Sequence, residues 1–504
     1  MSPDATETMT SGETLILASY FFVLGILAVY GWHRYYLVYL YMKHRDRTPG
    51  ARPPLDPLPR VTVQLPIFNE MYVAERLIAA ACALEYPREL LEVQVLDDST
   101  DETREIAELA VRRHAAQGVD IHYLHRTDRT GYKAGALQAG LRTARGEFVA
   151  IFDADFVPPA DFLTKALPHF ADRHVGMVQV RWGHLNQDYS LLTRIQSILL
   201  DAHFVLEHGG RSRAGCFFNF NGTAGVWRRA TIAAAGGWQH DTLTEDLDLS
   251  YRAQLLGWRF VFLPHVVSPA EVPVEMNGFK SQQHRWAKGS IQTCRKLLPQ
   301  ILASDLPVPV KMEAFFHLTA NFNYVLMVLL SLLMFPSMYV RYNMGWYEMM
   351  LIDVPLFVAA TLSFANFYMV SQREIYPDWR SRLKYLPLLM SVGIGLSVNN
   401  TRAVVEALFG RRGEFARTPK YGIERRSDEW VSKKYHQATL LQPLAEVALG
   451  IYFTGTVLYA LANGIYGTLP FLVLFQVGFL YTGVLSLVQQ WGGDGVALRA
   501  ETVK

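Results

Sequence analysis

Cysteine and charge are both scarce in this sequence of 504 residues. The three cysteines, Cys82, Cys216 and Cys294, lack the spacing of metal ligands, and their odd number suits a reduced, cytosol-facing location. Charged residues make up 19% of the chain, which is below the usual share of roughly one quarter. The formal net charge is only +2, so no overall field draws the chain to nucleic acid, and we expect no nucleic-acid partner.

Apolar residues make up 50% of the chain and are gathered in long runs. The first run extends from Leu15 to Tyr41 and is interrupted only by His33 and Arg34. It is long enough to span a bilayer, and the basic residues after it predict that its carboxyl end faces the cytosol. Four further runs are credible spans: Phe315 to Tyr339, Ile352 to Val370, Ala445 to Ala462 and Leu469 to Leu487.

The run from Leu386 to Phe409 differs because polar residues interrupt its second half. Basic clusters flank it on both sides, and the positive-inside rule puts both clusters in the cytosol, which a single pass cannot achieve. We therefore expect five spans and a protein integral to the plasma (inner) membrane. The expected parts are an N-terminal tail with the first span (1–47), a cytosolic domain (48–303) and a membrane region (304–504) with an interfacial or re-entrant helix (385–410) and a cytosolic loop (411–436).

The cytosolic domain alternates short strand-like and helix-like segments. This alternation is typical of an α/β domain with a parallel, Rossmann-type sheet. The expected strands are 61–65, 91–96, 121–124 and 146–152, and the expected helices are 73–84, 103–116 and 134–143.

Two carboxylates, Asp153 and Asp155, follow the last of these strands. If the strand continued through them, they would point to the same face, because alternate residues of an extended chain share a side. At the carboxyl end of a parallel strand, such a pair can hold a hard divalent cation that neutralises phosphate charge. Solvated aspartates at a polar strand end explain the pair equally well.

Two further motifs are expected at the same sheet edge. Asp97 and Asp98 end the second strand, where carboxylates suit hydrogen bonds to a nucleotide, although the residues that follow could simply cap a helix. Lys133 lies in a stretch of small residues that opens a helix and could approach a phosphate closely.

A run of acidic residues begins at Thr244, followed by Glu245 and Asp246. One of these carboxylates, near a reacting hydroxyl, could act as a general base. Acids at a helix N-terminus that complement the dipole are the alternative.

Two other stretches could contact a sugar. Gln282, Arg285 and Trp286 combine an aromatic face for a sugar ring with a guanidinium fork for phosphate oxygens. The loop of Asn221, Gly222 and Thr223 could line an acceptor site, or could be an ordinary turn.

The order of these motifs, Asp-Asp, Asp-x-Asp, Thr-Glu-Asp and Gln-x-x-Arg-Trp, resembles the family 2 glycosyltransferases in their processive, cellulose-synthase-like branch, and in particular the plant mannan and glucan synthases of that branch. The resemblance is dense from Val61 to Lys288. In the membrane half it thins to one loop that is similar to the gating loop Phe-x-Val-Thr-x-Lys of cellulose synthases. The matching residues are Phe415, Arg417 (where valine is usual), Thr418 and Lys420.

The resemblance implies a GT-A fold and a role for each motif. Asp97, Asp98 and Lys133 would contact the donor nucleotide, and Asp153 and Asp155 would bind it through Mg²⁺ or Mn²⁺. Asp246, flanked by Glu245 and Thr244, would be the general base. Gln282 and Arg285 would hold the diphosphate, and Trp286, with the Asn221–Thr223 loop, would hold the acceptor.

The function implied is inverting, processive transfer of a hexose from UDP-glucose or GDP-mannose to a growing β-linked polysaccharide that the spans translocate across the membrane. One alternative is a glucosylceramide-synthase-like enzyme that adds a single sugar to a lipid acceptor. A second alternative is a membrane transporter, but the charged residues within several spans that a transporter would carry are not evident in the sequence.

Overall fold

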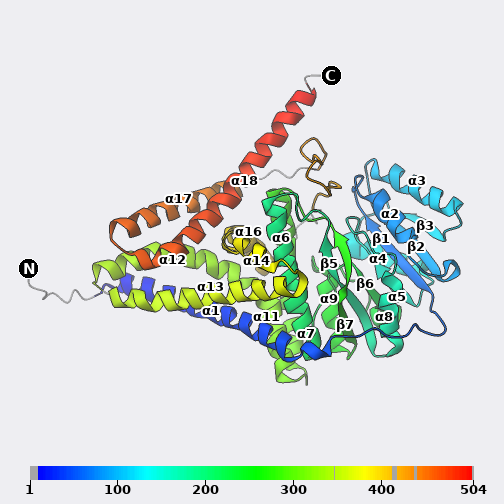
Figure 1. Ribbon diagram of the computed structural model, residues 1–504, viewed down its shortest axis with the longest axis horizontal. Coiled ribbons are helices and arrows are strands. Elements are labelled where there is room, and N and C mark those ends of the chain that lie inside the picture. Colours follow the sequence, from blue (N-terminus) through cyan, green and yellow to red (C-terminus); the bar gives the residue numbers. More distant parts are fainter. Residues whose placement is uncertain (1–8, 346, 411–416, 436–439, 502–504) are drawn as a thin grey trace, which may run out of the picture.

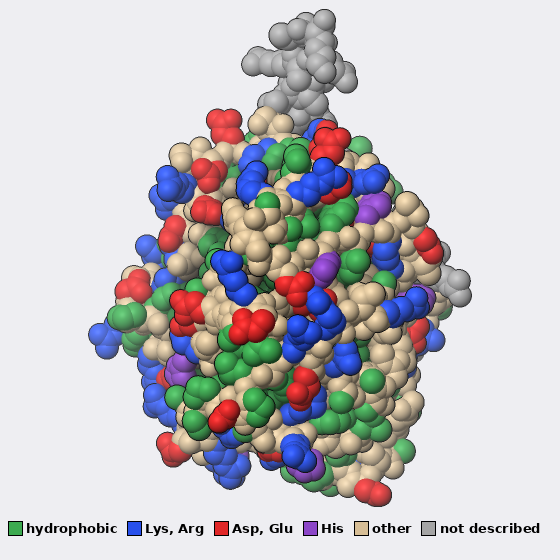
Figure 2. Space-filling view, turned by 90° about the vertical axis from the view of Figure 1, so that its right-hand side faces the viewer, with side chains coloured by type: hydrophobic (Ala, Val, Ile, Leu, Met, Phe, Trp, Pro, Cys, Tyr) green, Lys and Arg blue, Asp and Glu red, His purple; other side chains and the backbone are tan. Residues whose placement is uncertain are grey.

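The computed structural model describes residues 9–345, 347–410, 417–435 and 440–501. A sheet with helices packed around it forms one side of the molecule, and a bundle of long helices forms the other (Figure 1). On the sheet-domain face shown in Figure 2, Lys and Arg side chains are interspersed with Asp and Glu.

The sheet has seven strands in the order β3-β2-β1-β4-β6-β5-β7. The four strands β1 to β4 are mutually parallel, as predicted. The prediction of a purely parallel sheet was wrong beyond them, because β6 runs antiparallel to both β4 and β5. The strand–helix alternation from which the parallel sheet was inferred ends at β4. The strands are β1 (Val61–Ile67), β2 (Leu91–Asp97), β3 (Ile121–His125), β4 (Phe148–Ile151), β5 (Val175–His184), β6 (Gly225–Arg228) and β7 (Arg259–Ala270).

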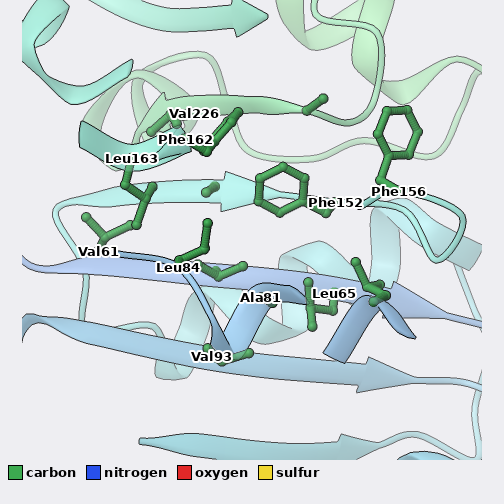
Figure 3. Packing of buried hydrophobic residues seen from close by; sticks show 14 of the residues in the cluster. Val61, Leu65, Ala81, Leu84, Val93, Phe152, Phe156, Phe162, Leu163 and Val226 are labelled. Carbon is green, nitrogen blue, oxygen red and sulfur yellow. The ribbon is translucent and has the colours of Figure 1, made fainter. Parts of the chain in front are cut away.

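Buried apolar side chains fix the position of the β4 end. Phe152, which follows β4 directly, is fully buried. Its ring packs edge-on against the ring of Phe162, with 4.8 Å between the two ring centroids (Figure 3). Burying a side chain of this size contributes roughly 1.5–3 kcal/mol, so Phe152 anchors the chain at the point where Asp153 follows. The helices of this domain are α2 (Ala74–Cys82), α3 (Thr103–Ala116), α4 (Tyr132–Thr143), α5 (Phe162–Ala166), α6 (Leu191–Ala202), the π-helix η4 (His203–His208), α7 (Gly209–Ala214), α8 (Arg229–Ala234) and α9 (Glu245–Leu255).

Helix α10 (Met276–Ala303) connects the sheet domain to the long helices. Buried Lys280 donates to Glu446 of α17 (Leu441–Ala462) at 2.5 Å, and buried Lys288 donates to Glu406 of α16 (Ser397–Leu408) at 2.8 Å. Ion pairs at two levels therefore fix the position of α10 relative to the helices beside it. The helices that follow are α11 (Val308–Thr319), α12 (Phe322–Asn343), α13 (Tyr347–Ile375), α14 (Trp379–Arg382), α15 (Leu386–Gly395), α16 (Ser397–Leu408), α17 (Leu441–Ala462) and α18 (Leu469–Glu501).

Within the described residues, six helices are long and apolar enough to cross a membrane, one more than the five spans expected, counting the N-terminal α1 (Ser11–Lys43). The additional one is Trp379–Leu408, which consists of consecutive shorter helices. Of its most apolar stretch of 18 residues, 61% is buried inside the protein. The interfacial placement of 385–410 stays a prediction.

These long apolar helices also contain charged residues, contrary to the expectation from the sequence that such charges are not evident within the spans. Asp353 of α13 is buried and forms an ion pair with Arg341 of α12, and Glu446 lies within α17. Each of these charges is paired, which is how proteins usually accommodate charges in an apolar environment.

Candidate active site

The carboxyl ends of the parallel strands β1, β2 and β4 meet at one cavity of about 150 Å³. Its walls include Ile67 at the end of β1, Asp98 after β2, and both Asp153 and Asp155 after β4. The strand does not continue through the aspartates as we had considered, because β4 ends at Ile151. A turn replaces it, in which the Phe156 N–H donates to the Asp153 carbonyl at 3.0 Å. The turn brings both carboxylates to the same cavity without an extended backbone.

Asp153 is held by groups on two other segments. The Lys133 ammonium, in the first turn of α4, donates to Asp153 Oδ1 at 2.5 Å and to the Gly222 carbonyl at 3.0 Å. The Asp153 N–H donates to the Thr223 hydroxyl at 2.9 Å. Thr223 is fully buried and is not among the residues that line the cavity, so the structure places it behind Asp153 and not at an acceptor surface.

Asp155 is covered by the loop after residue 416. Lys420 forms a buried ion pair with Asp155 and also donates to the Glu271 carbonyl at 3.1 Å. The Glu271 carboxylate accepts the N–H groups of Tyr421, Gly422 and Ile423 at 3.0, 2.8 and 3.2 Å. Arg417, Thr418 and Lys420 all line the cavity, and Phe415 lies outside the described residues.

The cavity concentrates negative charge. Burial, and then the carboxylates of Asp155 and Asp153, raise the pKa of Glu70 to about 7 although Arg417 lies 3.7 Å away. A divalent cation would relieve this repulsion, so the residues present fit one. Within the described residues, no three His, Cys, Asp or Glu side chains are grouped as ligands. Magnesium is commonly held by one or two carboxylates together with substrate phosphates, which is the set that Asp153 and Asp155 would supply.

The two aspartates after β2 have different surroundings. Asp98 lines the cavity and accepts two hydrogen bonds from Arg126, at 2.8 and 2.5 Å. Asp97 is fully buried, does not line the cavity, and accepts from the Ser99 N–H and the Tyr123 hydroxyl. The structure thus brings only Asp98 to a position from which it can contact a ligand directly.

Asp246 lies in the first turn of α9, after Thr244 and Glu245, and all three line the cavity. Burial, and then the charge of Glu245, raise the pKa of Asp246 to about 7, against the opposing effect of Lys133. The Leu247 N–H donates to Asp246 Oδ1 at 2.7 Å and so fixes one oxygen of the carboxylate. A carboxyl group with a pKa near neutrality is suited to general base catalysis.

Helix α10 brings Gln282, Arg285 and Trp286 to the same cavity, as does the loop that carries Asn221 and Gly222. All the predicted site residues among the described ones, apart from Asp97 and Thr223, therefore line one cavity.

A second cavity, of about 510 Å³, shares walls with the first. Asp246, Gln282 and Trp286 line both, and from them the second cavity extends among α1, α12, α13, α15 and α18. Such a volume lies within the range of roughly 300–1,000 Å³ that ligand-binding clefts usually have.

Several cavity residues were not found from the sequence. Glu70 and Glu271 come shortly after β1 and β7, so the strand-end argument that selected Asp98 could have found them. Trp182 lies within β5 and His203 and Glu207 within η4, where no local pattern marks them.

Comparisons with known proteins match this architecture. Residues 59–289 match the model of "Glycosyltransferase like family 2". Glucomannan 4-beta-mannosyltransferase 2 of Arabidopsis thaliana is 45% identical over 249 residues, which are 48% of this chain and 47% of that protein. Glucomannan 4-beta-mannosyltransferase 1 of Oryza sativa subsp. japonica is also 45% identical, over 48% of each chain. The chain thus spans about half the length of the curated relatives it matches.

A solved structure, the mannosyltransferase PcManGT of Pyrobaculum calidifontis in complex with GDP-Man and Mn²⁺, superposes with a TM-score of 0.52 at 23% identity, covering 79% of this chain and 99% of that one. This likeness concerns the fold alone and confirms the GT-A-like architecture. The matched domain contains every predicted site residue before the membrane half. Residues 59–289 are thus similar to family 2 glycosyltransferases, and their fold is a GT-A-like mixed sheet.

Proposed function

We propose that the chain is an inverting mannosyltransferase of the membrane that transfers mannose from GDP-mannose to a growing β-linked glycan. The observation that carries this is the single cavity in which Asp98, Asp153, Asp155, Asp246 and Arg285 meet, beside a second cavity among the membrane helices. The choice of mannose over glucose is supported by the names of the curated relatives and by the ligand of the PcManGT complex.

In the proposed reaction, the hydroxyl oxygen of the acceptor attacks the anomeric carbon while the bond from that carbon to the diphosphate breaks. Asp246 accepts the hydroxyl proton, and the diphosphate leaves with the electrons of the broken bond. Direct attack from the opposite face needs only one base and inverts the configuration. Arg285, with Lys133 at the Asp153 carboxylate, supplies positive charge beside the leaving group.

Asp153 and Asp155 would hold Mg²⁺ or Mn²⁺ together with the donor diphosphate. When bound, the cation supplies charge neutralisation for the leaving diphosphate. Because Lys420 is paired with Asp155, the loop that carries it has to release this carboxylate when a cation and donor bind.

The second cavity supports a polymer as product. It begins at Asp246 and Trp286 and continues between apolar membrane helices, so a glycan lengthened at Asp246 would enter it and pass along the bundle. The same walls would accept the lipid of a glycolipid, which remains the second candidate function.

A donor screen tests the proposal. The full chain, purified in detergent, is incubated with Mn²⁺ and either GDP-mannose or UDP-glucose, and nucleoside diphosphate release and the linkage of labelled product are measured. We expect release from GDP-mannose with label in a β-linked polymer and none from the Asp246→Asn variant. Label confined to lipid would favour the glycolipid enzyme, and turnover of UDP-glucose alone would overturn the choice of donor.

A further inference from the structure

A short polar surface lies on the otherwise apolar wall of the second cavity, next to the reaction site. It consists of His203 and Glu207 from η4 and Asn221 from the loop before β6, and is called the polar ledge below. Asn221 lines both cavities and is followed by Gly222, where an added Cβ would lie 3.0 Å from Asp246 Oδ2. The ledge therefore begins where the proposed transfer takes place.

Hydrogen bonds order the three side chains of the ledge. The Asn221 amide donates to His203 Nε2 at 2.9 Å, and the His203 Nδ1–H donates to Glu207 at 2.8 Å. The chain of donors and acceptors fixes the tautomer of His203. It ends on a carboxylate that has further acceptor capacity, since each carboxylate can accept several hydrogen bonds.

The ledge side chains keep accessible surface at the wall of the second cavity. The side chains of His203 and Glu207 are 27% and 28% exposed, whereas Phe204, Val205 and Leu206 between them are buried. The helix packs against α1, α13, β5 and β7, and His203 and Glu207 both line the second cavity.

Glu207 is ionised in this position. Burial alone would raise its pKa, but the hydrogen bond from His203 and the charge of Arg211 outweigh burial and hold the pKa of Glu207 below its ordinary value. Arg211 itself lies closer to Glu313, at 3.3 Å, than to Glu207, at 3.7 Å. A half-buried carboxylate is therefore kept charged, with part of its surface on the wall of the second cavity, where it can accept hydrogen bonds from a ligand.

The chemistry of the ledge matches a saccharide. Sugar hydroxyls donate to carboxylates and exchange hydrogen bonds with amides, while sugar rings present C–H faces to aromatic side chains. Trp182 and Trp286 line both cavities and supply such aromatic faces near the ledge.

We propose that the polar ledge is an acceptor subsite that binds the hydroxyl groups of the sugar unit behind the one that is attacked. This proposal rests on the proposed function, because it takes the acceptor to be a glycan. Glu207 accepts hydroxyl hydrogen bonds of that unit, and His203 and Asn221 orient Glu207 and contact the same unit. The subsite holds the end of the glycan in register with Asp246 between transfers.

The test measures binding without turnover, so that it does not depend on the donor. β-1,4-Mannotetraose and cellotetraose are titrated into the full chain in detergent without a donor, and tryptophan fluorescence follows binding. We expect one of them to bind the wild type and to bind Glu207→Gln and His203→Gln roughly tenfold more weakly, the loss typical of one hydrogen bond to a charged group. Binding of GDP to these variants stays unchanged.

Glu313→Gln is the matched control, because Glu313 pairs with Arg211 as Glu207 does but lines neither cavity. A structural role of the network predicts that Glu313→Gln weakens tetrasaccharide binding as much as Glu207→Gln, and this result would overturn the subsite. Equal binding by the wild type and Glu207→Gln would also overturn it while leaving the proposed function intact. If the wild type binds neither tetrasaccharide and labels only lipid, both the subsite and the polymer product are refuted.

Discussion

Lys420 and Asp155 form a buried ion pair across 265 residues of chain, so that a loop of the membrane half closes over the strand end of the sheet domain. Glu271, directly after β7, strengthens this closure by accepting three successive N–H groups of the same loop. Two carboxylates, those of Asp155 and Glu271, therefore hold the loop at the site, and this attachment depends on their charge.

Replacing Glu271 with Gln should loosen the loop. The amide keeps the shape of the side chain but loses the charge, and hydrogen bonds to charged groups are worth about 1.5–3 kcal/mol against roughly 1 kcal/mol for neutral ones. We expect hydrogen exchange at the amides of residues 421–423 to become about tenfold faster in Glu271→Gln, as measured by mass spectrometry. Glu424→Gln is the control, because Glu424 lies on the same loop and pairs with Arg76 at the surface, where ion pairs contribute little. Equal exchange in the two variants would contradict the role of Glu271.

The raised pKa of Asp246 predicts the pH dependence of transfer. A base must be deprotonated to act, so kcat/KM for the donor should fall as the pH decreases below about 7. Glu245→Gln removes the neighbouring charge that, after burial, raises this pKa, and should move the fall to lower pH. Measuring kcat/KM against pH, from about pH 5 to about pH 9, for the wild type and Glu245→Gln checks this prediction. A fall at the same pH in both would exclude Glu245 as a cause.

Much of the site was predictable because its residues follow strands. Asp98, Asp153 and Asp155 lie at the carboxyl ends of β2 and β4, and parallel strands bring such ends together. Lys420 was selected only through the family resemblance of its loop, and its ion pair with Asp155 was not predicted, since no local pattern relates the two residues. The ledge residues His203 and Glu207 were not predictable, because a π-helix has no periodic signal and their importance comes from a cavity formed by distant helices.

Removing one partner of the buried pair of Lys280 and Glu446 should destabilise the protein more than replacing both partners with apolar residues. Lys280→Met leaves Glu446 buried without its cation, and breaking such a pair from one side usually costs about 3–5 kcal/mol. We expect a clearly lower thermal midpoint for this variant in detergent, and recovery of most of the loss in Lys280→Met combined with Glu446→Leu. Transfer activity at low temperature should fall in the single variant, because α10 carries Gln282 and Trp286. A double variant no more stable than the single one would show that the pair acts in some way other than charge compensation.

Gly222 offers a test of how closely the loop before β6 approaches the Asp246 carboxylate. Its φ of +81° favours glycine, and an added Cβ would lie 3.0 Å from Asp246 Oδ2 and 3.2 Å from Lys133 Nζ. Gly215 has a similar φ of +72° with open space around it, so Gly215→Ala imposes the same backbone strain without the contact. Both variants should lose about 1 kcal/mol of stability in chemical denaturation. Only Gly222→Ala should also lose transfer rate, by roughly tenfold, because its Cβ would displace the Asp246 carboxylate by a few tenths of an ångström and rate falls steeply when reacting groups are misplaced. If Gly215→Ala lost as much activity as Gly222→Ala, backbone strain would explain the loss, and the contact with Asp246 would not be needed.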